Sequence, residues 1–324
     1  LEMKSEGVLS YGLLSVCILA GALAKGSIKK PSIAKVVETS LSCRTNELNI
    51  GEPLALRLTI ALDQANRVPN SDDLVHEWMQ EGYFEIASAL YDKESPKRVR
   101  AFPSVLSMQD AEGLHYGRCY ILFYDHARQT LLFDRSGEYR VRFIESPEII
   151  SDWLTLRIVE PSEDLTTAID LLSDPNDYWF LEFGDRLTGS DSESTIARLR
   201  RISDDYPRTV LGRWSAARLG LELFEQLQKK HPSFQKFRRE QRTGDVEPLL
   251  AQTVNYLQKA TMLSDDFEIR ERVLYQLALA EYLNGDFERA RVSLNELKTK
   301  YPHGVFGRRA DRAEEELNRV DAQK

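Results

Sequence analysis

The sequence predicts a β + α chain of two domains, an N-terminal antiparallel β-sandwich followed by stacked α-helices. Apolar residues recur with period two between residues 36 and 160, and with helical spacing from residue 161 onward. Two later segments, YPRTVLGR at 206–213 and YPHGVFGR at 301–308, are nearly the same. Such internal similarity is typical of helical-repeat arrays. The length of 324 residues is sufficient for two domains.

The composition indicates a folded, acidic chain. Hydrophobic residues make up 42% and charged residues 29%, which excludes an intrinsically disordered protein. The net charge of −8 argues against nucleic acid as a partner, because sequence-independent binding needs a basic surface. Local basic clusters could still form such a surface, although solvated helix faces explain them more simply. These clusters contain Arg198, Arg200, Arg201, Lys236, Arg238 and Arg239.

The first 35 residues have the pattern of an export signal. An uncharged, mostly apolar run at 8–24 ends in Ala-Leu-Ala, the small-residue pattern that signal peptidase recognises. We therefore expect a signal peptide at 1–24, with an uncleaved membrane anchor as the alternative, and a basic linker at 25–35. The expected location is the periplasm or the cell envelope, with membrane contact only through the N-terminal segment.

Residues 36–160 are predicted to form the β-sandwich. The segment 54–62 alternates leucine or isoleucine with smaller or more polar residues, as a strand with one buried face does. Shorter runs of the same kind, separated by turn residues, favour a sandwich. These runs lie at 84–87, 120–124, 139–143 and 154–158. The segment 71–80 (SDDLVHEWMQ) breaks the pattern and is predicted to be a short helical insertion.

A sharper pattern, D-x-x-G-x-Y, is formed by Asp134, Gly137 and Tyr139 at the start of a predicted strand. It resembles the tyrosine corner of immunoglobulin-like domains, in which the tyrosine hydroxyl bonds to upstream backbone. Val141 stands where antibody domains have a cysteine. The resemblance is therefore to the immunoglobulin-like sandwich architecture and not to true immunoglobulins.

Two cysteines, Cys43 and Cys119, remain if the signal peptide is removed. An exported chain can join such a pair in a disulfide. Alternation along the predicted strands places both side chains inward. The sequence supports a disulfide and a buried pair of thiols equally, because it contains no information on the distance between them.

Residues 161–324 are predicted to form three to four helix pairs, and residues 273–302 resemble a tetratricopeptide repeat (TPR). The segment 285–290 (GDFERA) matches the G-D-[FY]-E-x-A signature between the two helices of that repeat. Glycine permits the tight turn, alanine lets the helices approach, and proline ends the second helix. The residues that carry the signature are Leu274, Leu277, Ala278, Gly285, Ala290 and Pro302. The Tyr-Pro endings resemble those of TPR proteins of the bacterial envelope.

We find no convincing catalytic set, and expect neither an enzyme nor a cofactor or metal. The segment His76-Glu77-Trp78-Met79-Gln80 lacks the second histidine of the zinc-protease motif H-E-x-x-H. Nucleophile-elbow and P-loop patterns are also missing from the sequence. Trp179, Phe180 and Phe183 are predicted to wedge the two domains together, with an exposed platform for sugar as the alternative.

The TPR resemblance implies a non-enzymatic interaction or scaffold protein of the bacterial cell envelope, which holds a protein partner in the groove of its helix pairs. Candidate partner contacts on the first-helix faces are Arg213, Tyr275 and Glu281. The alternative is an accessory of a carbohydrate- or peptide-processing enzyme with its site on the β-sandwich. A third interpretation is a sugar-binding module that uses Trp78, Trp153 or Trp179.

Overall fold

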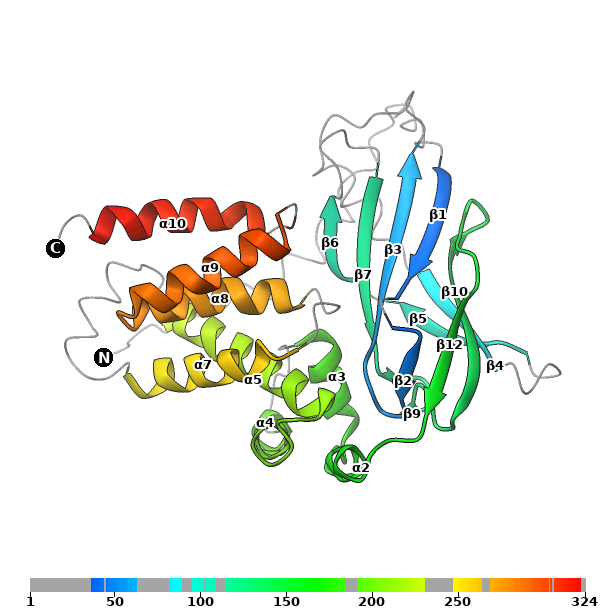
Figure 1. The fold of residues 1–324 in the computed structure, drawn as a ribbon. Coiled ribbons are helices and arrows are strands. Elements are labelled where there is room, and N and C mark those ends of the chain that lie inside the picture. Colours follow the sequence, from blue (N-terminus) through cyan, green and yellow to red (C-terminus); the bar gives the residue numbers. More distant parts are fainter. Residues whose placement is uncertain are drawn as a thin grey trace, which may run out of the picture. The chain divides into compact units, whose positions relative to one another are not determined.

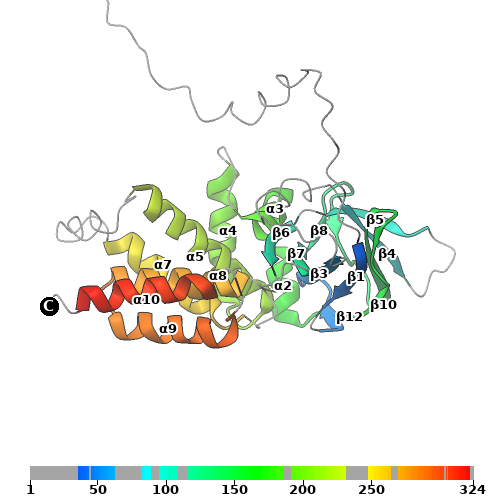
Figure 2. The ribbon, with the colours of Figure 1, turned by 90° about the horizontal axis from the view of Figure 1, so that it is seen from above.

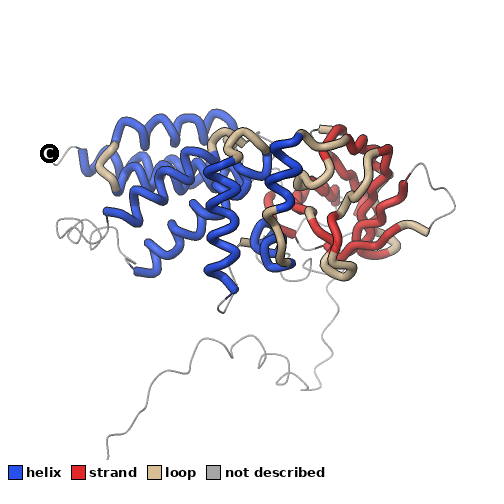
Figure 3. The backbone as a smooth tube through the Cα atoms, turned by 90° about the horizontal axis from the view of Figure 1, so that it is seen from below, coloured by secondary structure: helices blue, strands red, loops and turns tan. Residues whose placement is uncertain are grey.

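The computed structural model describes most of the chain, and the described residues belong to one structural unit. They are residues 36–43, 45–62, 82–88, 95–101, 103–108, 115–184, 191–230, 247–263, 269–302, 304 and 306–321. The predicted signal peptide and basic linker, and the predicted insertion at 71–80, lie outside them. Strands occupy the first part of the chain and helices the second, as the change of apolar period at residue 161 predicted (Figure 3).

The N-terminal region is built of short strands (Figure 1). Their bounds are β1 (Val36–Ser42), β2 (Glu47–Asn49), β3 (Leu54–Leu62), β4 (Gly82–Ser88), β5 (Lys97–Ala101), β6 (Pro103–Met108), β7 (His115–Leu122), β8 (Tyr124–Asp125), β9 (Thr130–Leu131), β10 (Gly137–Ser146), β11 (Ile149–Ile150) and β12 (Leu154–Val159).

These strands form two larger sheets and one small hairpin. The first sheet has the order β1-β3-β7-β6, and its neighbouring strands are all antiparallel. The second has the order β2-β12-β10-β4-β5, with β11 beside β10, and its β2–β12 pair is parallel. The β region is thus confirmed, but its sheets are mixed and do not make the clear antiparallel sandwich that the sequence predicted. The three-residue strand β2 is too short for its partner to be read from a pattern.

Side chains from both larger sheets share one hydrophobic core. Phe84 of β4 lies against Tyr120 of β7, with ring centroids 5.1 Å apart, and Phe143 of β10 lies 5.3 Å from both rings. Four of the alternating apolar residues of β3 are buried in this core, as their period predicted. They are Leu54, Leu56, Leu58 and Ile60.

The predicted tyrosine contact is present in the structure. The hydroxyl of Tyr139 donates to the carbonyl oxygen of Arg135, four residues upstream, at 3.0 Å. Gly137 has φ of 151°, a value that suits glycine between these two residues. This bond fixes the entry into β10, while the assignment of the region to immunoglobulin-like domains stays a prediction.

The disulfide between Cys43 and Cys119 is not formed, which corrects the first of the two alternatives. Strand β3 lies between β1 and β7, so the two cysteines are separated by two strand spacings of about 4.8 Å each, more than a disulfide spans. Cys43 also packs against the core between the sheets, whereas Cys119 alternates with the core residue Tyr120. The two thiols therefore lie on opposite faces of the sheet.

The C-terminal region consists of helices that lie alongside one another (Figures 1 and 2). Their bounds are α2 (Glu163–Asp170), α3 (Pro175–Phe183), α4 (Asp191–Asp205), α5 (Val210–Lys230), α7 (Glu247–Ala260), α8 (Ile269–Leu283), α9 (Phe287–Lys300) and α10 (Gly307–Asp321). Ser162 caps α2, and Asp174 forms a capping box at α3 in which Pro175 is the first helical residue. These caps explain why helices begin directly after the last strand.

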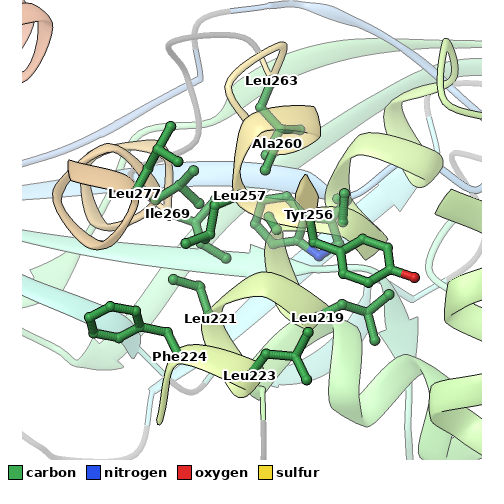
Figure 4. Packing of buried hydrophobic residues seen from close by; sticks show 14 of the residues in the cluster. Leu219, Leu221, Leu223, Phe224, Tyr256, Leu257, Ala260, Leu263, Ile269 and Leu277 are labelled. Atoms are coloured by element: carbon green, nitrogen blue, oxygen red, sulfur yellow. The ribbon is translucent and has the colours of Figure 1, made fainter. Parts of the chain in front are cut away.

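A second hydrophobic core fills the space between the helices (Figure 4). Leu257 of α7 lies among the apolar residues of α5 and is fully buried. A Cβ atom at Gly220 of α5 would be 2.8 Å from the Leu257 side chain, so the glycine permits α5 and α7 to approach closely. The same core includes Ile121 and Phe123 from the β region, so that the two regions pack through shared apolar residues.

Candidate functional site

The best-defined functional element is the hairpin formed by α8 and α9. Gly285 connects the helices with φ of 83°, a left-handed conformation that glycine adopts without strain. Asp286 then caps α9 by accepting the amide of Arg289 at 3.2 Å. Ala290 is fully buried at the helix crossing, and α9 ends at Lys300, two residues before Pro302. The other signature residues, Leu274, Leu277 and Ala278, are buried on α8.

The two Tyr-Pro segments have the same backbone geometry. The carbonyl oxygen of Tyr206 would be 2.0 Å from a Cβ atom at Gly212, and that of Tyr301 would be 1.8 Å from one at Gly307. Each carbonyl also accepts an amide three residues later, at 3.1 Å in both segments. The glycine in each segment is therefore needed because the next helix begins against the tyrosine carbonyl. This shared requirement explains the sequence similarity that the repeat interpretation depended on.

The caps of the two following helices use different residues. In the first segment, the hydroxyl of Thr209 accepts the amide of Gly212 at 3.0 Å. The second segment has Gly304 at that position, and the carboxylate of Glu271 on α8 accepts the amides of Phe306 and Gly307, at 2.6 and 3.0 Å. A Cβ atom at residue 304 would be 2.1 Å from this carboxylate. Glycine at 304 thus makes room for a cap supplied by a neighbouring helix.

The repeated turn sorts the helices into two layers. Tyr206 follows α4 and Tyr301 follows α9, so α4 corresponds to α9, and α5 corresponds to α10. The helix that follows each Tyr-Pro turn, α5 or α10, is therefore the first helix of a pair, as α8 is the first helix of the pair α8–α9. Helix α8 contacts both α5 and α10. The second helices are α4, α7 and α9, each of which contacts the first helices beside it. An ion pair between Lys259 of α7 and Asp204 of α4, at 2.5 Å, joins two second helices.

An ion pair also joins two first helices. Arg272 of α8 donates to the carboxylate of Glu225 on α5, and both side chains are 36% exposed. The pair therefore belongs to the surface of the first-helix layer, where a bound segment could reach it. Sequence reasoning missed it because the two residues are 47 positions apart.

Two of the three predicted partner contacts are half-buried. Arg213 donates to the carbonyl oxygens of Met262 at 3.2 Å and Arg208 at 2.9 Å, and so ties the start of α5 to the turn after α7. Tyr275 lies on α8 with its ring 5.3 Å from that of Phe306, near the start of α10. Both residues lie in the first-helix layer, and both make contacts within the protein.

The third predicted contact, Glu281, is wrong because its side chain is only 4% exposed. The carboxylate accepts hydrogen bonds from Gln258 of α7 at 3.3 Å and Ser293 of α9 at 2.8 Å. It therefore points to the second helices and away from the first-helix surface. Burial raises the pKa of Glu281, while these two hydrogen bonds lower it less than burial raises it. The helical period of Leu274, Leu277 and Glu281 could have revealed the shared inward face.

A buried carboxylate connects the β region to the helices. Glu182 of α3 accepts the amides of Phe123 and Tyr124 at 2.6 and 2.7 Å, and its other oxygen lies 2.6 Å from Nε2 of His126. All three partners belong to the segment that follows β7. Sequence reasoning did not find Glu182, because a lone acidic residue in a helix gives no signal of burial.

The same turn of α3 is held from the other side by α5. Trp214 and Arg218 both donate to the carbonyl of Leu181 at 2.7 Å, and Arg218 also bonds to the carbonyl of Glu182. Burial and, second to it, the positive charge of the nearby Arg272 lower the pKa of Arg218 to about 9, although the charge of Glu182 opposes them. The guanidinium thus caps the carboxyl end of α3, where the helix dipole is negative.

The aromatic residues of α3 differ in their surroundings: some pack toward the β region, and some reach the surface. Phe180 is buried, whereas Trp179 is 38% exposed. Tyr178 packs toward the β region, where it stacks on Tyr124 with centroids 4.1 Å apart. The rings of Trp179 and Phe183 also reach that region, with centroids 5.1 and 6.2 Å from that of His126. Trp179 and Phe183 lie beside each other, with centroids 4.6 Å apart. The remaining sugar-platform candidate in the described residues, Trp153, lies beneath the guanidinium of Arg142 at 4.4 Å.

Neither a metal centre nor a membrane helix is found in the part of the chain that the structure describes. In that part, no three histidine, cysteine, aspartate or glutamate side chains are placed to hold a metal ion together. The helices described there are also not long and apolar enough to cross a membrane. His76 and Glu77, the residues of the incomplete zinc motif, lie outside the described residues.

A family model described as tetratricopeptide repeat matches residues 272–304. The match covers the α8–α9 hairpin and the second Tyr-Pro turn, so that a TPR motif lies in the C-terminal helical region. It coincides with residues 273–302, where the sequence resemblance placed it. No curated protein matches the chain significantly in sequence.

Some solved structures show slight similarity to part of the chain. A β-glucosidase from Listeria innocua in complex with isofagomine is 19% identical, with a TM-score of 0.26, over 39% of this chain and 16% of that chain. The same enzyme in complex with glucose is 16% identical, with a TM-score of 0.22, over 37% and 16%. This chain spans less than a fifth of that enzyme's length. Similarity this low supports no inference about fold or activity.

Proposed function

We propose that this protein is a non-enzymatic interaction or scaffold protein that holds a protein partner on its first-helix layer, formed by α5, α8 and α10. The observation that carries the proposal is the TPR motif at 272–304, since arrays of such helix pairs commonly bind proteins. The repeated Tyr-Pro turn supports an array that extends from α8–α9 to α5 on one side and α10 on the other.

The proposed site lies around the ion pair between Glu225 and Arg272. These side chains are half-exposed, carry opposite charges and come from two successive first helices. A bound segment that forms an ion pair with either residue would break the pair between Glu225 and Arg272. The free energy lost is small, because exposed ion pairs contribute only about 0–1 kcal/mol to stability. Tyr275 supplies an aromatic contact three residues farther along α8.

We further propose that the protein is exported to the periplasm or cell envelope and that its β region is an immunoglobulin-like spacer. The apolar run at 8–24, with its Ala-Leu-Ala ending, supports export. The bond between Tyr139 and Arg135 supports the comparison with immunoglobulin-like domains. Removal of the first 24 residues in cells, read by mass spectrometry of the mature protein, tests the first of these two statements.

Partner capture with a matched pair of variants tests the binding site. The tagged chain is cross-linked in the envelope fraction of its source cells, and the proteins it recovers are quantified. The Glu225→Ala/Arg272→Ala variant should recover the main partner at least fivefold less than the unchanged chain does. The control, Glu288→Ala/Arg291→Ala, removes an ion pair within the second helix α9 and should recover it fully. Equal recovery by both variants would exclude the first-helix layer as the site.

A further inference from the structure

The outward side of the second sheet carries a concentration of arginines. We call it the arginine face and define it by five residues of β5, β10 and β12. They are Arg98, Arg100, Arg140, Arg142 and Arg157. In each strand these residues alternate with apolar residues that face the core between the sheets, such as Val99, Val141 and Leu156. The face therefore consists of outward positions of a half-buried sheet.

The arginine face has a charge opposite to that of the chain as a whole. Its strands also present three outward glutamates. Glu47 and Glu138 lie opposite Arg157 on the strands to either side of β12. Glu85 of β4 lies opposite both Arg98 and Arg142. Five arginines and three glutamates give a net charge of +2, whereas the whole chain carries −8. Charge complementarity therefore selects an acidic partner for this face.

The centre of the face is held rigidly. Arg142 donates twice to one carboxylate oxygen of Glu85, at 2.9 and 2.6 Å, and Arg98 donates to the other at 3.1 Å. Burial raises the pKa of Glu85, but the hydrogen bonds from Arg142 and Arg98, together with their positive charges, outweigh burial, so the pKa is lowered and the carboxylate stays charged. Glu85 thus fixes two guanidinium groups that still reach solvent, with 66% of the Arg98 side chain and 32% of the Arg142 side chain exposed.

Aromatic rings support the arginines. The guanidinium of Arg98 lies 4.8 Å from the ring centre of Tyr83, and those of Arg142 and Arg140 lie 4.4 and 5.6 Å from that of Trp153. Stacking on a ring orders a guanidinium without using its hydrogen-bond donors. The arginines consequently lose less side-chain entropy when they bind a carboxylate.

The spacing of the face suits an extended peptide. Residues two apart on one strand, such as Arg140 and Arg142, are separated by about 6.8 Å. Alternate side chains of an extended acidic segment repeat at the same distance. A long polyanion fits less well because glutamates interrupt the arginines, and because a net charge of −8 opposes sequence-independent binding to nucleic acid.

We propose that the arginine face is a second interaction surface, which binds an extended acidic segment of a protein. Alternate Asp or Glu residues of the segment pair with Arg140 and Arg142 along β10, and Arg98 of β5 adds a positive charge beside the segment. This surface lies on the β region and is independent of the helical repeat. The repeat and the face would then engage a partner, or two partners, at separate places.

Fluorescence anisotropy of the full chain with a labelled peptide tests the proposal. The probe is a ten-residue peptide of alternating Asp and Thr, and its control has Asn in place of Asp. The acidic peptide should bind, with an affinity that falls at least fivefold between 25 and about 150 mM salt, because exposed charge pairs are screened. Equal binding of the Asn peptide, or no binding of the Asp peptide at low salt, would overturn the proposal.

Two double variants assign the binding to the face. Arg98→Gln/Arg140→Gln should weaken binding at least tenfold, while Arg142 remains to pair with the buried Glu85 and preserve the fold. Arg201→Gln/Arg208→Gln makes the same charge change on exposed residues of the helical region and should leave binding unchanged. Equal losses in both variants would show a general charge effect and overturn the site. A dT ten-mer or phosphatidylglycerol vesicles could instead bind more tightly than the acidic peptide and lose that binding in the Arg98→Gln/Arg140→Gln variant. This result would overturn the proposal that the face binds an acidic peptide.

Discussion

Replacing glycine with alanine at two helical positions, Gly212 and Gly307, should have the opposite effect on stability to the one that helix propensity predicts. Gly212 is the third residue of α5 and Gly307 is the first residue of α10. Alanine is favoured over glycine within helices by about 1 kcal/mol, so propensity alone predicts stabilisation at both positions. We expect destabilisation, because each new Cβ atom would lie within about 2 Å of a tyrosine carbonyl oxygen.

The magnitude follows from what must move. The carbonyl of Tyr206 accepts the amide of Thr209 at 3.1 Å and its hydroxyl at 2.8 Å. Relief of the overlap requires a shift of more than about 1 Å, which breaks both bonds, each contributing about 1 kcal/mol. Added strain from overpacking brings the expected loss at Gly212 to about 2–4 kcal/mol. Gly285 differs, because nothing lies within 4 Å of its Cβ position and only its φ of 83° opposes alanine, at about 1–2 kcal/mol.

Urea denaturation followed by circular dichroism measures these differences, and hydrogen exchange localises them. The free energy of unfolding should fall most for Gly212→Ala and less for Gly285→Ala. Gly307→Ala should mainly accelerate amide exchange in α10, the last helix of the array. An increase in stability for Gly212→Ala, or a larger loss for Gly285→Ala, would refute the assignment of these glycines to close backbone contact.

Three further predictions concern buried carboxylates. Glu182→Ala leaves two buried amides without an acceptor and should cost about 3 kcal/mol in urea unfolding, whereas Glu182→Gln keeps an acceptor and should cost less; equal costs would contradict this role. Glu281→Gln should stabilise by about 1 kcal/mol at pH 7 and less at pH 4. This pH dependence follows because the pKa of Glu281 is higher in the folded protein than in the unfolded protein, so the free energy of unfolding decreases as pH rises from the unfolded pKa through the folded pKa. Thermal melts in which Glu281→Gln shifts the midpoint equally at pH 4 and pH 7 would contradict this prediction. Glu271→Ala should raise amide exchange at residues 306–308 about tenfold, since it removes a cap contributing about 1 kcal/mol; unchanged exchange there would exclude this cap.

The elements that could be predicted from the sequence are those with local signals. The α8–α9 hairpin follows from Gly285 and the spacing of apolar residues, and the burial of alternate residues in β3 follows from period two. The bond of Tyr139 to Arg135 follows from a pattern of six residues. In each case the residues that decide the structure are close together in the chain.

The elements that could not be predicted depend on distant partners. The parallel pairing of β2 with β12 joins residues more than 100 positions apart. Cys43 and Cys119 both appear inward-facing by alternation, but two different cores lie on the two faces of their sheet. Glu281 and Glu182 are buried by contacts with other helices and with the β region, and a single sequence contains no signal for those contacts.

The arginine face had a local signal that was not used. Arg140 and Arg142 alternate with Val141 and Phe143, so the period that identifies β10 also places both arginines on its outward side. The segment KRVRA of β5 shows the same alternation. What the sequence lacked was the order of the strands, which brings β5 and β10 to either side of β4.

Site-specific photo-cross-linking tests the central claim, that the first-helix layer binds a protein partner, most directly. A photoreactive aromatic residue is placed at Tyr275 on α8, one turn from Arg272, or at Val292, which is 67% exposed on the second helix α9. After irradiation of source cells, we predict one prominent cross-linked protein from position 275 and little or none from position 292. A partner that cross-links from position 292 and not from position 275 would contradict the claim.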